Sequence, residues 1–216
     1  MYLQHVFLCD WSYCSGQPIH PESGYFNQAE IHSENTGVQI AACGPDSPVA
    51  TIQLSFLKAI SLARHEILIT TPYFIPGETI MDALRVAALG GIKVMLLVPD
   101  MSDSRLVNAA ACSNYTDLLD CGVEIYRYYK GFIHSKTMVV DGSISMVGTG
   151  NMDYRSFELN FEVNAIVYSP VCAGTLREAF FRDLESASRI DPAAWERRPL
   201  IRRLPERVAR LLSPLL

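Results

Sequence analysis

The stretch Phe132–Asn151, FIHSKTMVVDGSISMVGTGN, decides how this chain folds and where its polar chemistry collects. Its β-branched and apolar residues flank Asp141-Gly142, a pair that favours the tight turn of a β-hairpin. The pattern therefore predicts a strand, a turn and a second strand. Because side chains alternate between the two faces of a strand, His134 and Lys136 should point the same way. This arrangement sets an imidazole beside an ammonium group.

These side chains suit reactions at a phosphodiester, whose negative charge repels nucleophiles and calls for cations and hydrogen-bond donors where no metal is bound. Lys136 supplies charge, and His134 can attack phosphorus or protonate a leaving alkoxide. Thr149 adds a hydroxyl and Asn151 an amide, in a glycine-rich segment that lets the backbone approach a ligand. Asp141 joins this candidate catalytic set, although its place at the turn favours fixing the loop by hydrogen bonding over touching substrate.

Length and composition indicate a globular protein with one sizeable core. Of the 216 residues, 49% are hydrophobic and 19% are charged, which excludes a disordered chain. No apolar run approaches the roughly 18 to 20 residues of a membrane span, and the start of the chain lacks the pattern of a signal peptide. The six cysteines have no zinc-like spacing, so we expect free cytosolic thiols, no metal site and no cofactor.

The net charge of -5 is unevenly distributed. From Trp195 to Leu216 there are six arginines and two glutamates, so this tail is about +4 and the remainder about -9. The acidic body argues against binding nucleic acid. The tail also has leucines at helical spacing and Pro205 near the expected helix start. It is predicted either to rest on an anionic membrane surface or to dock on its own domain.

Strands alternate with helices along the chain, which predicts an α/β sandwich. Besides the hairpin, we expect strands at 38–42, 67–71, 92–98, 123–128 and 161–168, and helices at 3–14, 48–64, 78–89, 104–120 and 171–186. Ser47 is available to cap the second of these helices. The loop 71–76 follows a strand at the edge of the sheet where ligands collect in open α/β sheets.

Glu162 is a carboxylate inside the otherwise apolar run 161–167. Burying a carboxylate is costly unless it is paired, and a histidine is a natural partner. The alternative is that Glu162 lies on an exposed face of the strand.

The spacing His-x-Lys-x4-Asp, followed by Gly-Thr-Gly-Asn, resembles the HKD motif of the phospholipase D superfamily. Segments outside the motif, including VQIAACGPDSP, LITTPYFIPGE, GTGNMDYRSFELNFEVN and RLPERVARLLSPLL, are similar to the second catalytic domain of bacterial cardiolipin synthases of the phospholipase D type. The resemblance implies a phospholipase D-like α-β-α sandwich with a mixed central sheet flanked by helices. It also implies four parts: the end of a first such domain (1–17), a linker (18–36), the catalytic domain with one motif (37–190) and the basic amphipathic tail (191–216).

In that family two motifs meet at one site and no metal is needed. One histidine forms a phosphohistidine, the other protonates the leaving alcohol, and lysines and asparagines hold the phosphate. The resemblance implies His134 as acid or nucleophile, with acid favoured, and Lys136, Thr149 and Asn151 as phosphate binders. Thr149 takes the position usually held by serine, and Glu162 matches the glutamate that orients a catalytic histidine. The implied reaction converts two phosphatidylglycerols to cardiolipin and glycerol.

The chain has one such motif, because no other histidine is followed by lysine at the second position. The second motif is expected from another copy or from a missing N-terminal half. Three readings stay open: a phosphatidyltransferase acting on anionic phospholipid, a homodimeric metal-independent phosphodiesterase or nuclease, and a catalytically incomplete fragment. The membrane-anchoring segment usual in the family is absent, so the expected location is peripheral, on the cytoplasmic side of the bacterial inner membrane.

Overall fold

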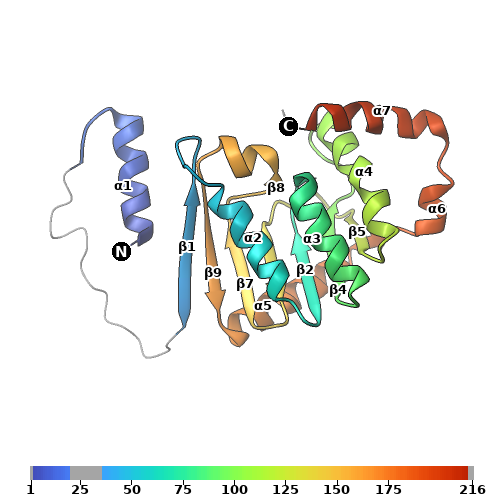
Figure 1. Ribbon diagram of the computed structural model, residues 1–216, viewed down its shortest axis with the longest axis horizontal. Helices are drawn as coiled ribbons and strands as arrows, with labels where there is room; N and C mark the ends of the chain where they lie inside the picture. Colours follow the sequence, from blue (N-terminus) through green and yellow to red (C-terminus); the bar gives the residue numbers. More distant parts are fainter. Residues whose placement is uncertain (1, 20–35, 214–216) are drawn as a thin grey trace.

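The predicted hairpin lies near the middle of a mixed eight-stranded sheet in the computed structural model, which describes residues 2–19 and 36–213 (Figure 1). The strand order is β1-β9-β7-β6-β2-β4-β5-β10. The three parallel strands are β2 (Glu66–Thr70), β4 (Lys93–Pro99) and β5 (Glu124–Tyr128). Each of the other strands pairs antiparallel with its neighbours: β1 (Gly37–Cys43), β9 (Glu162–Tyr168), β7 (Ile144–Gly148), β6 (Thr137–Val140) and β10 (Ala187–Arg189).

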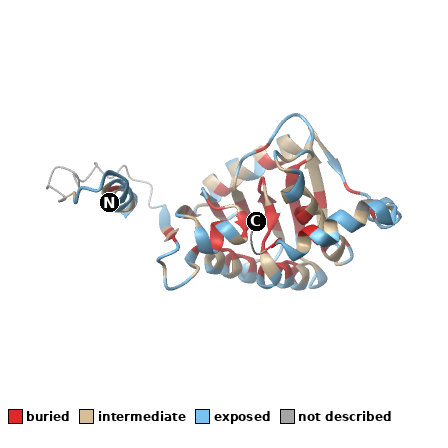
Figure 2. Cartoon of the chain, turned by 90° about the horizontal axis from the view of Figure 1, so that it is seen from above, coloured by how far each residue is buried: buried red, intermediate tan, exposed pale blue. Residues whose placement is uncertain are grey.

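Helices cover both faces of this sheet, so the expected α-β-α sandwich is confirmed. One face carries α2 (Thr51–Leu62), α3 (Gly77–Leu89) and α4 (Arg105–Leu119), and the other carries α5 (Pro170–Leu184). Each face has its own apolar core, and buried residues gather in the strands and on the helix surfaces turned toward them (Figure 2). The strand β4 is buried throughout after Lys93, as expected for a strand covered on both sides.

Local sequence signals explain where most helices begin and end. Ser104 and Ser169 cap α4 and α5 by accepting hydrogen bonds from backbone N–H groups in the first turn. The predicted Ser47 cap is wrong: α2 begins at Thr51, and the Ser47 hydroxyl instead accepts a hydrogen bond from the Gly44 N–H. Ser47 therefore closes the turn that precedes the helix.

The hairpin forms as predicted, with Val140 paired to Ile144 around a three-residue turn. Asp141 and Gly142 both have positive φ, +50° and +59°, a conformation that asparagine, aspartate and glycine tolerate best. One expectation is corrected. The strand β6 begins at Thr137, so His134 and Lys136 lie in the segment before the strand. Their neighbourhood is therefore set by contacts with loops and not by strand alternation.

Several short elements that the sequence does not reveal join the loops at one edge of the sheet. The two-residue strand β3 (Phe74–Ile75) pairs with β8 (Met152–Asp153), and a π-helical turn, Arg155–Leu159, follows directly. The loop after β2 is thereby tied to the segment after β7. Elements this short have no detectable hydrophobic period.

The two ends of the described chain are helical. Helix α1 (Tyr2–Ser15) matches the predicted helix, whereas most of the predicted linker, residues 20–35, lies outside the described residues. After β10 come α6 (Pro192–Glu196) and α7 (Leu200–Leu211), with Pro205 inside α7 and not near its start. Across residues 2–19 and 36–213, no helix has both the length and the hydropathy needed to cross a bilayer.

Candidate active site

The predicted site residues, apart from Asp141, gather at one edge of the sheet, which we call the site edge. Thr70 at the end of β2 lies opposite Thr137 at the start of β6, and Thr137 lies opposite Val147 near the end of β7. Gly148 in turn pairs with Asn164 near the start of β9. The residues just before β6, just after β7 and at the start of β9 therefore meet, and these include His134, Lys136, Thr149, Asn151 and Glu162.

His134 is exposed at the site edge and is flanked by aromatic rings. Its ring centroid lies 5.4 Å from that of Phe132 and 6.5 Å from that of Tyr73, the latter nearly edge-on at 82°. The Tyr73 hydroxyl donates a 2.7 Å hydrogen bond to Asp103, in the loop after β4. Burial and this hydrogen bond raise the pKa of Tyr73 to about 12, while the hydroxyl lowers the pKa of Asp103. The imidazole therefore lies beside a tyrosine ring that a hydrogen bond holds in place, and its remaining surface is exposed to solvent.

Lys136 is half-buried beside this histidine. Its Nζ donates a 2.9 Å hydrogen bond to the backbone oxygen of His134. Burial lowers the pKa of the Lys136 ammonium, and the negative charges of Glu162 and Asp153 oppose this effect. The ammonium is therefore partly stripped of water and, among residues 2–19 and 36–213, has no direct carboxylate partner, a condition that favours an incoming anion.

A network centred on the buried Ser156 links the loop after β7 to the start of β9. The Ser156 N–H donates to Asp153 at 2.7 Å, and its hydroxyl accepts the Asn151 N–H at 3.1 Å. The same hydroxyl lies 3.4 Å from Glu162 Oε1, which also accepts from Asn160 Nδ2 at 3.1 Å. Burial raises the pKa of Asp153. The Asn151 side chain also hydrogen-bonds Asp153, which partly offsets this rise. Within the described chain, the buried Oδ1 of Asn151, an acceptor, has no hydrogen-bond partner.

Glu162 is half-buried at the start of β9, and its carboxylate is held by Ser156 and Asn160. The histidine partner expected from the sequence does not bond it among residues 2–19 and 36–213. The carboxylate is thus fixed in place with acceptor capacity left over, since a carboxylate can accept several hydrogen bonds.

Thr149 and Gly148 join β7 to β9. The Thr149 hydroxyl accepts the Val163 N–H at 2.9 Å, so its first role is to secure the backbone. A Cβ on Gly148 would meet Asn164 Oδ1 at 2.0 Å and the Val163 oxygen at 2.4 Å. Only glycine fits at Gly148.

Asp141 lies at the other end of β6, away from the site edge. Its carboxylate accepts three backbone hydrogen bonds of 2.8 Å, from Arg64, His65 and Glu66 at the turn into β2. Burial alone would raise the pKa of Asp141, but these N–H groups outweigh it and the pKa lies below its ordinary value. Although Asp141 belongs to the motif, its position is that of a residue that fixes the hairpin to the sheet.

Sequence reasoning missed several residues that shape the site. Tyr73 lies in the loop 71–76 that the sequence marked as the ligand edge, so its place could have been inferred. Phe132 opens the quoted stretch but resembles a core residue. Asp103, Asp153 and Ser156 offered no pattern, because their roles depend on contacts between loops.

Comparison with known proteins identifies relatives of this arrangement. A family model described as "Cardiolipin synthase, PLD-like domain" matches residues 56–184. The chain is 45% identical over 216 residues to a cardiolipin synthase of Geobacillus sp. (strain WCH70) and 47% identical to cardiolipin synthase 2 of Bacillus anthracis. These matches cover 99% of the chain but only 43% and 42% of the two relatives. The chain therefore spans about two fifths of their length.

Solved structures share the fold at low sequence identity. Nuc of Salmonella typhimurium, a phospholipase D family member, aligns with a TM-score of 0.62 and 20% identity over 72% of this chain and 98% of its own. Phosphatidylserine synthase of Haemophilus influenzae aligns with a TM-score of 0.66 and 14% identity over 84% of this chain and 48% of its own. The same domain thus accounts for nearly all of one protein and about half of the other.

Proposed function

The chain belongs to the family of cardiolipin synthases with a phospholipase D-like domain, and on this premise we propose that it supplies one half of a phosphatidyltransferase site. Its substrate class is phosphatidylglycerol, the reaction produces cardiolipin and glycerol, and the second histidine comes from another motif. The cardiolipin synthases named above are relatives over two fifths of their length, so the full reaction is part of this proposal.

The observation that carries the proposal is the pairing of an exposed imidazole with a partly desolvated ammonium at the site edge. His134 is exposed, and Lys136 lies beside it with no direct carboxylate partner in the part of the chain that the structure describes. Asn151 lies in the same loop cluster, and its side-chain NH2 group is a donor of the kind that a phosphate oxygen accepts. Together these groups suit a phosphate whose leaving alcohol must gain a proton.

In the proposed reaction, a histidine of the other motif attacks phosphorus and breaks the bond to the glycerol headgroup. His134 as imidazolium gives its proton to the departing alkoxide and becomes neutral. A hydroxyl of a second phosphatidylglycerol then attacks the phosphohistidine while neutral His134 takes up its proton. Lys136 balances phosphate charge in both steps, and Asn151 orients the phosphate. Thr149 and Asp141 act by holding the loops that present these groups.

The carboxylate of Glu162 can accept a further hydrogen bond in this scheme, beyond those it makes in the structure. Ser156 and Asn160 hold its carboxylate at the site edge. We assign it the task of orienting a catalytic histidine, which lowers the freedom of the imidazole and stabilises its protonated form.

A chimera tests the proposal directly. The matched part of Bacillus anthracis cardiolipin synthase 2 is replaced by this chain, which restores a complete two-motif protein. The chimera, in vesicles of labelled phosphatidylglycerol with EDTA, should form cardiolipin, and His134→Ala should abolish the product. His65→Ala is the matched control, because His65 is exposed at the far edge, the opposite ends of the strands from the site edge, and its hydrogen bond to Asp141 comes from its backbone N–H. A chimera whose product does not depend on His134 would refute the proposal.

A second candidate is a homodimeric phosphodiesterase, favoured by the fact that this fold makes up 98% of the Salmonella protein Nuc. Two copies related by a two-fold axis could bring His134 near its own mate. The isolated chain, assayed beside the chimera, separates the two candidates. Turnover by the isolated chain that rises with the square of its concentration would favour the homodimer.

A further inference from the structure

Helix α7 is docked with its apolar side facing outward. Six apolar residues of α7 and its C-cap are 39% to 81% exposed, and we call them the outer stripe: Leu200, Ile201, Leu204, Val208, Leu211 and Leu212. At about 100° per residue, they fall within one arc of about 120°. Ala209, which lies outside this arc, is only 1% exposed. A helix that served only to complete the core would turn its apolar arc the other way.

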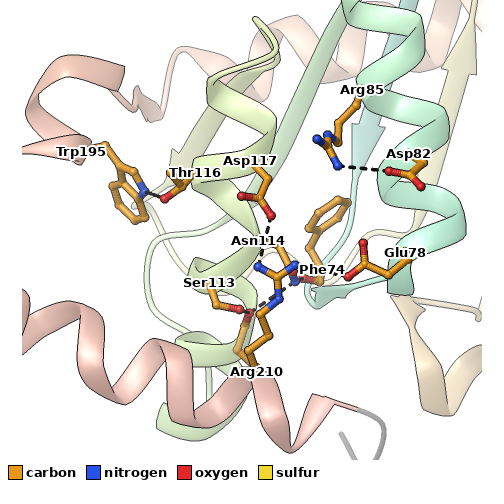
Figure 3. Close-up of polar contacts among 11 residues, drawn as sticks. Phe74, Glu78, Asp82, Arg85, Ser113, Asn114, Thr116, Asp117, Trp195 and Arg210 are labelled. Atoms are coloured by element: carbon orange, nitrogen blue, oxygen red, sulfur yellow. Dashed lines mark hydrogen bonds and ion pairs between the residues drawn. The ribbon is translucent and has the colours of Figure 1, made fainter.

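Polar contacts hold α7 in this orientation. Arg210 reaches Asp117 of α4 at 3.2 Å and Glu78 in the first turn of α3 at 3.3 Å (Figure 3). Nearer the start of the helix, Glu206 forms an ion pair with Arg198 at 2.6 Å. The Arg198 guanidinium also stacks over Trp195, whose Nε1 donates to Thr116 of α4. The docking is therefore made by charges and small residues.

The polar flank of α7 adds basic charge beside the outer stripe. A hollow of about 170 Å³ between α4 and α7 is lined by four arginines, among them Arg203 and Arg207, and by the acidic residues Asp117 and Glu206. Both acids already pair with arginines. Within the described chain, Arg203 and Arg207 make no ion pair. The flank is thus able to meet an anion.

The helix also lies at the site edge. Glu78 is the second residue of α3, which follows the loop that carries Tyr73, and Asn114 Nδ2 of α4 lies 3.5 Å from the backbone oxygen of Phe74 in the same loop. Figure 1 shows α7 across the end of α4 at which β2, β4 and β5 finish. A flat surface that touched the outer stripe would therefore lie on the side of the molecule where His134 is exposed.

We propose that the outer stripe and its arginine flank dock this domain onto an anionic bilayer and turn the site edge toward the lipid headgroups. Charge complementarity selects this occupant. The tail is about +4 and the remainder about -9, so an anionic surface repels the body and attracts α7, which fixes the orientation. The inference extends the proposed function to the surface on which it works, but its test measures binding and not turnover.

The test is flotation of the isolated chain with vesicles of phosphatidylcholine, with and without phosphatidylglycerol. We expect binding that requires phosphatidylglycerol. Leu204→Ser with Val208→Ser should weaken it at least tenfold, because these two side chains supply much of the apolar area that would become buried in the bilayer. Arg203→Gln with Arg207→Gln should weaken it about fivefold for each arginine.

Two matched controls accompany these variants. Val86→Ser with Leu89→Ser removes an equally exposed apolar pair from the far end of α3, and Lys58→Gln with Arg64→Gln removes two exposed cations at the far edge. Both controls, and His134→Ala, should bind as the parent does. The vesicle-binding test therefore stays informative if the chimera makes no cardiolipin, and the cardiolipin test stays informative if the isolated chain does not bind vesicles.

Three results would overturn the inference. The first is no binding of the parent to phosphatidylglycerol vesicles. The second is equal loss of binding in the α7 variants and their controls. The third is a stripe variant that converts a dimer to a monomer in sedimentation velocity while vesicle binding stays unchanged, which would make α7 a surface between copies of the chain.

Discussion

The two ends of strand β6 belong to one sequence motif and differ sharply in how their polar groups are bonded. At the turn, Asp141 accepts three backbone hydrogen bonds of 2.8 Å. At the site edge, His134 is exposed and the Lys136 ammonium bonds only a backbone oxygen within the described chain. Polar groups whose hydrogen bonds are all made stabilise a fold, whereas groups with unmade hydrogen bonds lower its stability and are able to bind a ligand. The motif therefore joins a structural end to a reactive end.

Lys136→Met should lower catalytic turnover strongly without lowering the stability of the fold. Loss of a phosphate-binding cation is expected to lower turnover of the chimera by about 10² to 10³-fold. Burial lowers the pKa of Lys136, so its charged form destabilises the folded state at neutral pH, and this cost disappears as the pH rises toward the ordinary value of 10.5. The free energy of unfolding from urea denaturation should consequently not decrease. Lys93→Met, at an exposed strand start, is the control for both measurements.

Asp141→Ala should damage the structural end by about 3 kcal/mol, because three N–H groups lose a charged acceptor and alanine fits poorly at φ +50°. The depressed pKa of Asp141 stabilises the fold above the ordinary value of 3.8, and this contribution disappears as pH falls through the folded-state pKa. Denaturation of parent and variant at neutral and acidic pH should show their difference shrinking on acidification. An equal difference at both values would argue that the carboxylate charge is irrelevant.

Gly148→Ala should cost about 2 kcal/mol, since the new Cβ would lie against the backbone of β9. The change lies at the site edge, so a loss of stability would show that this end of the sheet also contains a backbone contact that the fold depends on. Thermal denaturation measures it. Gly174→Ala is the control, because a Cβ at that helical glycine meets no atom within 4 Å and alanine favours helices. A fully stable Gly148→Ala variant would show that β7 and β9 can separate freely.

Tyr73→Phe should have the smallest effect, below about 1 kcal/mol in stability, because the lost hydrogen bond to Asp103 is exposed. Turnover of the chimera should fall about tenfold or less, because the hydrogen bond holds the Tyr73 ring in place beside His134. The NMR chemical shifts of the His134 ring separate positioning from folding, since only positioning predicts changed ring shifts in an otherwise native spectrum.

The sequence predicted the order of strands and helices well, because the hydrophobic runs and their glycine and serine boundaries are local signals. The hairpin is the clearest case, with Asp141 and Gly142 in the left-handed conformation that the pair favours. The site was predicted through the spacing of the motif and its resemblance to a family. Its internal geometry was not, because His134 and Lys136 precede the strand that was expected to hold them.

What the sequence could not provide depends on contacts between distant segments. The strands β3 and β8 are too short to show a period, and they form because two loops meet. The amphipathic pattern of α7 was visible, but the side that faces the domain was not. Arg210, Arg198 and Ala209 decide it by their contacts with other segments, which turn the apolar side outward.

One measurement tests most directly whether the two ends of β6 have separate tasks: turnover per folded molecule and free energy of unfolding, determined together for the chimera bearing His134→Ala or Asp141→Asn. Loss of cardiolipin formation at full stability is predicted for His134→Ala. Reduced stability with turnover retained in the folded fraction is predicted for Asp141→Asn. Cardiolipin formation that survives His134→Ala, or that is abolished in stably folded Asp141→Asn, would contradict the account.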